Sequence, residues 1–191
     1  MKQKAQIIQD ICSALLSDDK EKAKEIARRD YPFVIPSSSK RQMTDTRRTQ
    51  IFIRDGFLDR YTGEQLVYPG AIILLSVLLP EEFPSHPNWK MSESHIFYWE
   101  LWPTIDHVIP VARGGTDDES NWVCTSMIRN SAKSNWLIEE IGWKLLPSGD
   151  FNEWDGLIHW FMAYVKQHPL MLENKEIKKW HATAKHCLPS P

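Results

Sequence analysis

The sequence has no pair of cysteines separated by two residues. Its three cysteines, Cys12, Cys124 and Cys187, lie far apart along the 191-residue chain. Cysteine zinc knuckles and disulfide-stapled folds need clustered or paired cysteines, so both kinds of framework are disfavoured. Unpaired thiols are typical of a reducing compartment, and we therefore expect a cytoplasmic protein.

Long apolar runs are also lacking. The most apolar run, residues 71–79, is far shorter than the ~20 residues that a membrane-spanning helix needs. The first twelve residues are amphipathic and do not resemble the apolar region of a signal peptide. We therefore expect no membrane partner, whereas the sequence leaves the oligomeric state undecided.

The chain carries little net charge. The formal charge is −2 at pH 7, so a nucleic-acid partner would need a local basic surface. Residues 40–60 contain six basic residues against three acidic ones. This local excess is consistent with phosphate contact and equally with a solvated loop.

Helical periodicity is found at both ends of the chain. Apolar residues recur at helical spacing over 2–17, and Ser17-Asp18-Asp19 indicates a break before a second helix. Residues 1–34 thus predict a helical hairpin, followed by a basic linker over 35–50. Residues 146–191 predict a helical extension packed on the core, in which the last helix, over 174–186, is basic and lies at the surface.

The segment 80–103 is rich in proline and aromatic residues. We expect its rings to pack beneath a central site, and stacking on nucleic-acid bases is the alternative. The apolar run 71–79 before it is consistent with a buried helix or a buried strand, because its length does not decide between them.

Residues 104–136 combine polar side chains with a pattern of strand, loop, strand and helix. A β-branched run ends in Asp106 and His107, and a proline and a Gly-Gly pair then interrupt it. A second strand-like run begins at Asn121, and Asn130 lies in the helix-compatible segment that follows. We expect a site where these pieces meet.

Asp106, His107 and Asn130 are a sufficient set for hydrolysing a phosphodiester. The carboxylate and the amide offer oxygen ligands to Mg²⁺, which keeps several waters and takes one or two protein groups. Imidazole titrates near neutrality, so His107 can accept a proton from water. Lys133 lies three residues after Asn130 on the same helix face, where we expect it to contact phosphate.

These residues resemble the HNH endonuclease family. The family pattern D-H-x-x-P, Gly-Gly, Asn, and His or Asn followed by Lys is matched by Asp106-His107-Val108-Ile109-Pro110, Gly114-Gly115, Asn121, and Asn130 with Lys133 and Asn135. The resemblance implies that His107 is the general base and that Asp106 and Asn130 are metal ligands. It also implies that Asn121 braces the loop and helps to orient the base. Asn in the last place makes this the H-N-N variant, which is also found in RNA-guided DNA nucleases.

The likeness extends more weakly to Arg54-Asp55-Gly56-Phe57. In many HNH proteins a similar run precedes a C-x-x-C-G zinc knuckle, but here residues 59–63 contain no cysteine. We therefore expect no structural zinc, and we expect aromatic packing to replace it.

The resemblance implies an α+β fold with a ββα-metal (HNH, or His-Me finger) core within residues 51–145 and additional N- and C-terminal helices. It implies a metal-dependent endonuclease that hydrolyses DNA, with Mg²⁺ as the expected metal and Mn²⁺ or Zn²⁺ as alternatives. The residues expected to bind the nucleic acid are Lys133, Arg47, Arg48, Arg54 and Arg60. Three alternatives stay open: a module that binds nucleic acid without cutting it, RNA as the substrate, and a partner-recruiting protein built on the terminal helices.

Overall fold

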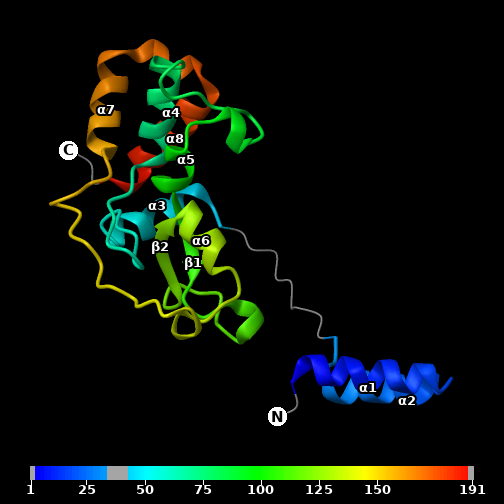
Figure 1. Cartoon of the computed structure of the whole chain (residues 1–191). Coiled ribbons are helices and arrows are strands. Elements are labelled where there is room, and N and C mark those ends of the chain that lie inside the picture. The colour runs from blue at the N-terminus through cyan, green and yellow to red at the C-terminus, as the bar shows by residue number, and fades with distance from the viewer. Residues whose placement is uncertain (1–2, 34–42, 189–191) are drawn as a thin grey trace. The chain divides into compact units, whose positions relative to one another are not determined.

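A computed structural model describes residues 3–33 and 43–188 (Figure 1). The chain divides into two compact units, residues 1–41 and 42–191. The described residues form eight α-helices and one two-stranded antiparallel sheet, so the fold is α+β. None of the helices in these two ranges is long and apolar enough to cross a membrane.

The first unit is a hairpin of two helices, α1 (Lys4–Leu16) and α2 (Lys20–Asp30). The side chain of Asp19 accepts a hydrogen bond from the Lys22 amide at 3.0 Å and so begins α2, which confirms the predicted break and cap. The hairpin has few buried side chains, among them Ile7, Ala14 and Ala23. The first half of the expected 35–50 linker, including Lys40 and Arg41, lies outside the described residues.

Residues 45–50, expected as the end of that linker, are instead helical. Helix α3 (Asp45–Arg54) begins at Thr44, whose hydroxyl accepts a hydrogen bond from the Arg47 amide at 3.2 Å. A threonine followed by an acidic first turn is a helix-start signal. The prediction missed this signal because the many charged residues around it are typical of a linker. The helix packs through Thr49, Ile51 and Phe52.

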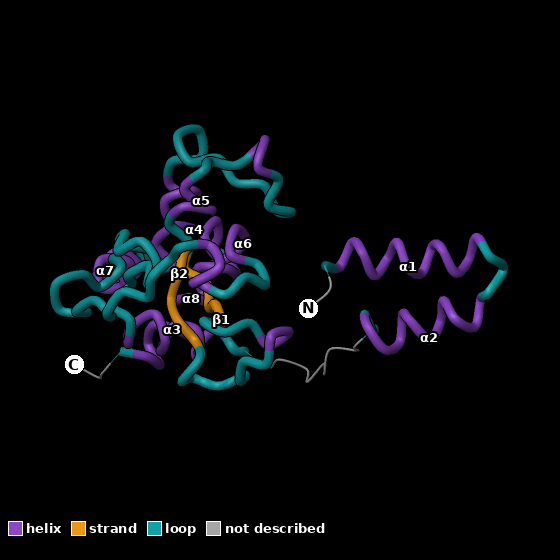
Figure 2. The backbone as a smooth tube through the Cα atoms, turned by 60° about the horizontal axis from the view of Figure 1, so that its bottom comes forward, coloured by secondary structure: helices purple, strands orange, loops and turns teal. Residues whose placement is uncertain are grey.

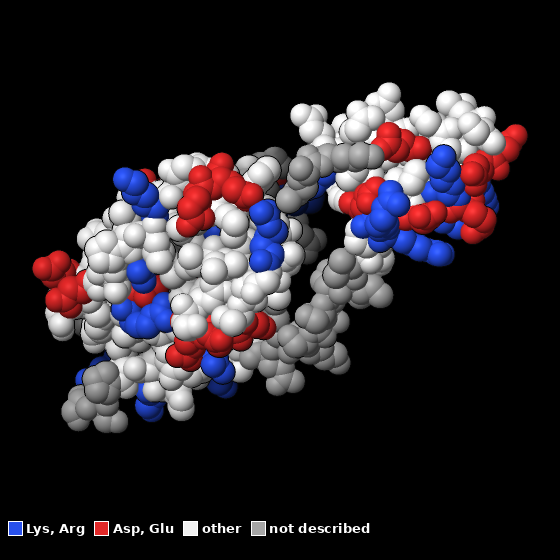
Figure 3. Space-filling view, turned by 90° about the horizontal axis from the view of Figure 1, so that it is seen from below, with Lys and Arg blue, Asp and Glu red and all other residues white. Residues whose placement is uncertain are grey.

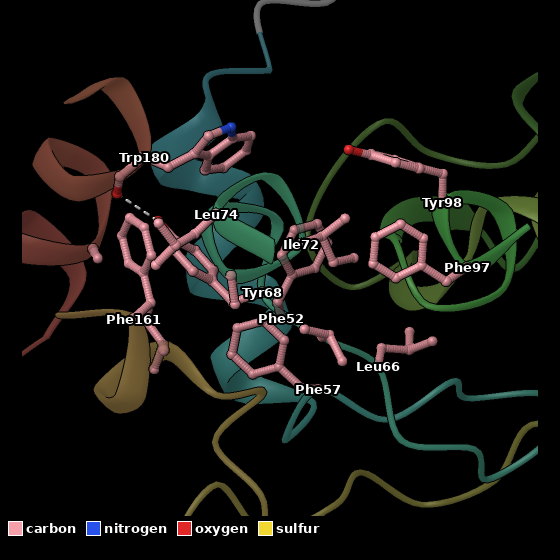
Figure 4. Packing of buried hydrophobic residues seen from close by; sticks show 14 of the residues in the cluster. Phe52, Phe57, Leu66, Tyr68, Ile72, Leu74, Phe97, Tyr98, Phe161 and Trp180 are labelled. Carbon is pink, nitrogen blue, oxygen red and sulfur yellow. Dashed lines mark hydrogen bonds between the residues drawn. The ribbon is translucent and has the colours of Figure 1, made fainter. Parts of the chain in front are cut away.

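The main core of the second unit lies between α3 and three further helices (Figures 1 and 4). These are α4 (Pro69–Leu78), α7 (Ile158–Gln167) and α8 (Lys175–Cys187), and the short α5 (Phe97–Glu100) also contributes. The apolar run 71–79 is therefore a helix, and a proline at its first position suits a helix start. The largest fully buried side chains of this core include Phe52, Phe57, Leu66, Tyr68, Ile72, Leu74 and Phe161.

Helix α8 belongs to this core, although the sequence predicted a surface helix. Ile177, Trp180 and Ala184 are at most 4% exposed, and their spacing places them on one face. The Tyr68 hydroxyl donates a hydrogen bond to the Trp180 carbonyl at 2.6 Å, drawn as a dashed line in Figure 4. The prediction was wrong because the lysines dominated the pattern, whereas a buried stripe needs only a few apolar positions.

The sheet carries the candidate site. Strand β1 (Pro103–His107) pairs antiparallel with β2 (Trp122–Ser126), so that His107 lies opposite Trp122. Helix α6 (Met127–Lys133) follows β2 directly and contacts both strands (Figure 2). Short 3-10 helices complete the described part: η1 (Met91–Glu93), η2 (Val111–Arg113), η3 (Ile138–Ile141) and η4 (Pro169–Glu173).

A buried carboxylate, Asp59, ties the turn at residues 59–63 to the end of β2. Its Oδ2 accepts hydrogen bonds from the Thr125 hydroxyl at 3.0 Å and from the Ser126 amide at 2.9 Å, and its Oδ1 accepts one from the Tyr61 amide at 3.0 Å. The side chain is 0% exposed.

A second buried carboxylate, Asp55, supports the same region. It accepts a hydrogen bond from the Cys124 amide at 2.8 Å and pairs with Arg54 and Arg60 at 2.9 and 3.0 Å. Burial, and then the nearby carboxylates, raise the pKa of the Cys124 thiol well above its usual value, so that it stays neutral. Asp59 and Asp55 therefore tie residues 55–63 to β2 through buried hydrogen bonds.

Replacing Asp59 with asparagine is expected to lower the free energy of unfolding of the second unit by about 1.5–3 kcal/mol, because hydrogen bonds to a charged acceptor are lost. Urea unfolding followed by tryptophan fluorescence measures the loss. Asp118→Asn, on an exposed loop, is the control and is expected to change stability by less than about 0.5 kcal/mol. Equal stability of the two variants would show that Asp59 does not tie the turn.

Candidate functional site

Polar side chains from β1, α6 and the loop between the strands meet at the end of the hairpin. Asp106 and His107 are the last two residues of β1. Asn121 immediately precedes β2, and Asn130 lies on α6. The order of these elements brings residues 24 positions apart to one end of a five-residue strand pair.

The Asp106 carboxylate is 6% exposed, accepts one hydrogen bond and forms one ion pair. Its Oδ2 lies 2.8 Å from the Lys133 ammonium and 2.6 Å from the Tyr61 hydroxyl. Burial, and then the Asp106 charge, raise the pKa of Tyr61 far above its usual value, so the phenol keeps its proton and remains a donor. Both bonds go to Oδ2, which leaves Oδ1 as the atom through which Asp106 would hold a metal.

Lys133 is fully buried. The expectation that it contacts phosphate is therefore wrong. Besides its pair with Asp106, its ammonium donates a hydrogen bond to the His107 carbonyl at 2.7 Å. The side chain of Lys133 therefore fixes both members of the Asp-His pair. Its helix face looked solvated in the sequence, but α6 packs that face against β1 and Tyr61.

His107 has a carboxylate partner that the sequence reasoning missed. Its Nε2 lies 2.7 Å from Asp117 Oδ1 and 3.0 Å from Trp122 Nε1, and the indole is 3.3 Å from the same carboxylate oxygen. The Trp122 indole N–H can donate to His107 Nε2 or to Asp117, and in the tautomer with a proton on Nε2 both the indole and the imidazole N–H donate to Asp117. This tautomer leaves Nδ1 of His107 with its lone pair.

Asn130 is fixed by two hydrogen bonds to β1. Its Nδ2 donates to the Thr104 hydroxyl and to the Ile105 carbonyl, each at 3.1 Å. The side-chain nitrogen of Asn130 therefore faces β1 at Ile105, the residue before Asp106. The side-chain oxygen of Asn130 makes neither of these two bonds.

Asn121 spans the loop between the strands. Its Oδ1 accepts a hydrogen bond from the Ile109 amide at 2.9 Å, and its Nδ2 donates to the carbonyls of Ile109 and Thr116, each at 2.8 Å. A Cβ at Gly115 would lie 1.9 Å from the Ile109 carbonyl oxygen. Any side chain at position 115 would clash with this carbonyl and push the loop away from Asn121. The close approach therefore requires glycine at position 115.

Two of the arginines expected to bind nucleic acid hold the fold together instead. Arg54 pairs with Asp55 and donates to the carbonyls of Glu119 and Trp122. The side chain of Arg60 is 13% exposed, and it donates to Asp55 and to the Leu146 carbonyl. Sequence alone could not place carboxylates and carbonyls around these guanidinium groups.

The other two arginines lie at the surface of α3. Arg47 pairs with Glu119 at 3.3 Å and lies 5.0 Å from the centre of the Trp122 ring, and Arg48 pairs with Asp45 at 3.1 Å. Both side chains are about half exposed. On the face of the second unit drawn in Figure 3, lysines and arginines form small groups separated by acidic ones rather than a continuous basic surface.

Asp106 and Asn130 carry side-chain oxygens of the kind that bind hard cations. No group of three or more His, Cys, Asp or Glu side chains that could hold a metal ion occurs within residues 3–33 and 43–188. A carboxylate and an amide nevertheless fit Mg²⁺, which is commonly held by one or two protein oxygens and several waters.

Tyr61, Asp117 and Trp122 were not predicted as parts of the site. Asp117 had a usable signal, because it follows the Gly-Gly pair and lies ten residues from His107. Tyr61 had none, because its contact with Asp106 spans 45 residues. Comparisons of the chain with models of protein families, with curated proteins and with solved structures gave no match.

Proposed function

We propose that the second unit is a metal-dependent endonuclease of the HNH type, with β1, β2 and α6 as its ββα-metal core, and that it hydrolyses phosphodiester bonds in DNA. The observation that supports this most is the bond from Asn130 on α6 to the Ile105 carbonyl. It holds an amide from the helix beside the strand end that carries Asp106 and His107. A carboxylate, an imidazole and an amide at one strand end match the chemistry of metal-assisted hydrolysis.

His107 is the general base in this proposal. In this proposal His107 is the tautomer whose Nε2–H donates to Asp117, 2.7 Å away, so Nδ1 is the atom that takes a proton from the attacking water. Asn121 holds the loop that carries Asp117, through its hydrogen bond to the Thr116 carbonyl. Asp117 and Asn121 therefore act as positioning residues for the base.

Asp106 and Asn130 are the residues that would hold the metal. A bound divalent cation, most simply Mg²⁺, supplies positive charge where negative charge develops on the phosphate and the leaving oxygen. Lys133 and Tyr61 keep the Asp106 carboxylate in place, and Tyr61 adds no charge because it stays protonated. Arg47 and Arg48 are the exposed arginines that remain as candidates for backbone contact.

Incubation of the full chain with supercoiled plasmid, linear duplex DNA and RNA tests the proposal. With Mg²⁺ or Mn²⁺ we expect nicked or linear plasmid, and with EDTA we expect none. Tight binding of DNA without cleavage in either metal would instead support a module that binds without cutting. Cleavage of RNA alone would show that the substrate is RNA and not DNA, and it would leave the proposed hydrolytic mechanism unchanged.

Replacing Asp117 with asparagine is expected to lower kcat for plasmid cleavage about 10–100-fold, the usual range for a partner that orients a functional histidine. The KM for plasmid is expected to stay unchanged, because Asp117 acts on the base and not on substrate binding. Asp118→Asn, one residue away, is the matched control. An equal kcat for both variants would remove Asp117 from the site.

A further inference from the structure

A cavity of about 540 Å³ lies between α4, the aromatic segment at residues 85–102, and α8. Four of its lining side chains are aromatic: Trp89, Tyr98, Trp102 and Trp180. None of the four contributes a side chain to the site at the end of β1. This volume falls within the range of sites that take small molecules.

The aromatic rings present both faces and edges. Trp89 and Trp180 meet Trp102 nearly at right angles, with ring centres 4.8 and 6.0 Å apart. Tyr98 is stacked on Trp102 with the ring centres 6.1 Å apart. Such a wall suits a flat ring, since aromatic faces stack on one another and edges meet faces favourably.

Two polar features accompany these rings. The indole N–H of Trp180 is buried and has no hydrogen-bond partner among the described residues, and the residue is 4% exposed. The hydroxyls of Ser76 and Tyr98 share a 2.6 Å hydrogen bond in which either one can be the donor. Figure 4 shows the Tyr98 hydroxyl pointing toward Trp180. Buried polar groups normally find partners, so an occupant with an acceptor atom would complete the arrangement.

The rim of the cavity narrows the class of occupant. The Lys179 ammonium lies 4.9 Å from the centre of the Trp180 ring, so that ring face is already covered, and it pairs with Glu176 at 2.8 Å and with Asp45 at 3.6 Å. An acyl chain would leave the indole N–H unpaired. A flat heteroaromatic ring with acceptor atoms packs against the other rings and can pair with that N–H.

We propose that this cavity binds a nucleobase, packed against the aromatic wall formed by Trp89, Tyr98 and Trp102 and accepting a hydrogen bond from the Trp180 indole. The base can belong to a free nucleotide or to an unstacked position in a single strand. The inference goes beyond the proposed endonuclease, because the binding requires neither a metal nor His107.

The test uses the ¹⁵N-labelled full chain and its indole N–H signals, with the Trp180 signal assigned from Trp180→Phe. The probes are the four deoxynucleoside monophosphates, a single-stranded oligonucleotide and an abasic strand of equal length. A shift of the Trp180 signal with a monophosphate identifies a free nucleotide as the source, and a shift with the base-bearing strand alone identifies a strand. No shift with any base-bearing probe, or an equal shift with the abasic strand, overturns the proposal.

Calorimetry on three variants gives an independent readout. Trp180→Phe keeps a ring and removes the N–H, and it is expected to weaken binding about three- to tenfold, the effect of one hydrogen bond. Tyr98→Phe keeps the ring and removes a hydroxyl that bonds Ser76 and not the base, so it is expected to bind as the wild type does. Trp160→Phe, on the partly exposed side of α7, is the control and is expected to change nothing. Equal affinity of all three variants and the wild type contradicts the assignment.

Discussion

Replacing His107 with alanine is expected to reduce plasmid cleavage about 10²–10⁴-fold, the contribution of a general base. In the proposed reaction no other side chain takes the proton from the attacking water. The rate is measured as loss of supercoiled plasmid at saturating Mg²⁺, with the fold checked by circular dichroism. Binding of plasmid is expected to persist, because His107 contributes to the chemical step.

The chain offers a close control for this variant. His159 pairs with Asp155 at the same 2.7 Å that separates His107 from Asp117, but its side chain is 60% exposed at the start of α7. His159→Ala is therefore expected to cleave at the wild-type rate. Cleavage by His107→Ala at that same rate would mean that the base is another group.

Replacing Lys133 with methionine is expected to lower the free energy of unfolding of the second unit by about 3–5 kcal/mol, because the Asp106 charge would stay buried without its partner. The ammonium is 0% exposed and also bonds the His107 carbonyl, so two buried acceptors lose a donor. Urea unfolding without added metal measures the loss. Lys166→Met on the exposed end of α7 is the control.

A double variant separates the ion pair from simple packing. If the pair carries the effect, Asp106→Asn together with Lys133→Met is expected to be less destabilised than the sum of the two single changes. Additive losses would indicate that packing alone explains them. Wild-type stability of Lys133→Met would show that the ammonium is not needed to hold the Asp-His pair.

The order of elements around the candidate site could be predicted from the sequence. A β-branched run, a proline, a Gly-Gly pair and a second run are local signals, and they led to the strands that hold Asp106 and Asn121 at their ends. The cap at Asp19 was likewise a local signal. Structural features that depend on only a few neighbouring residues, such as strands, turns and helix caps, were therefore predictable.

Partners distant in the sequence were not predictable. Lys133, Arg54 and Arg60 look like surface cations in a sequence, because nothing nearby shows that the fold will bring Asp106 to Lys133 and distant carbonyls to the two arginines. Their positions depend on contacts across 27, 68 and 86 residues, to Asp106, the Trp122 carbonyl and the Leu146 carbonyl. The same holds for Tyr61, whose role exists only because the turn at residues 59–63 packs against β1.

The turn at residues 59–63 is tied by a carboxylate. Asp59 makes three short hydrogen bonds across it. The sequence showed that this turn contains no cysteine. It did not show the role of Asp59, because an isolated aspartate in a polar turn is most often solvated.

Calorimetric titration with Mn²⁺ tests the metal assignment, on which the proposed chemistry depends, most directly. Wild-type protein is expected to bind one ion per chain, with the affinity reduced at least about tenfold in Asp106→Asn and in Asn130→Ala, the usual scale for metal-site changes. Asp118→Asn, from the nearby loop, is expected to bind as the wild type does. Unchanged Mn²⁺ affinity in both Asp106→Asn and Asn130→Ala would contradict a metal site at the end of β1.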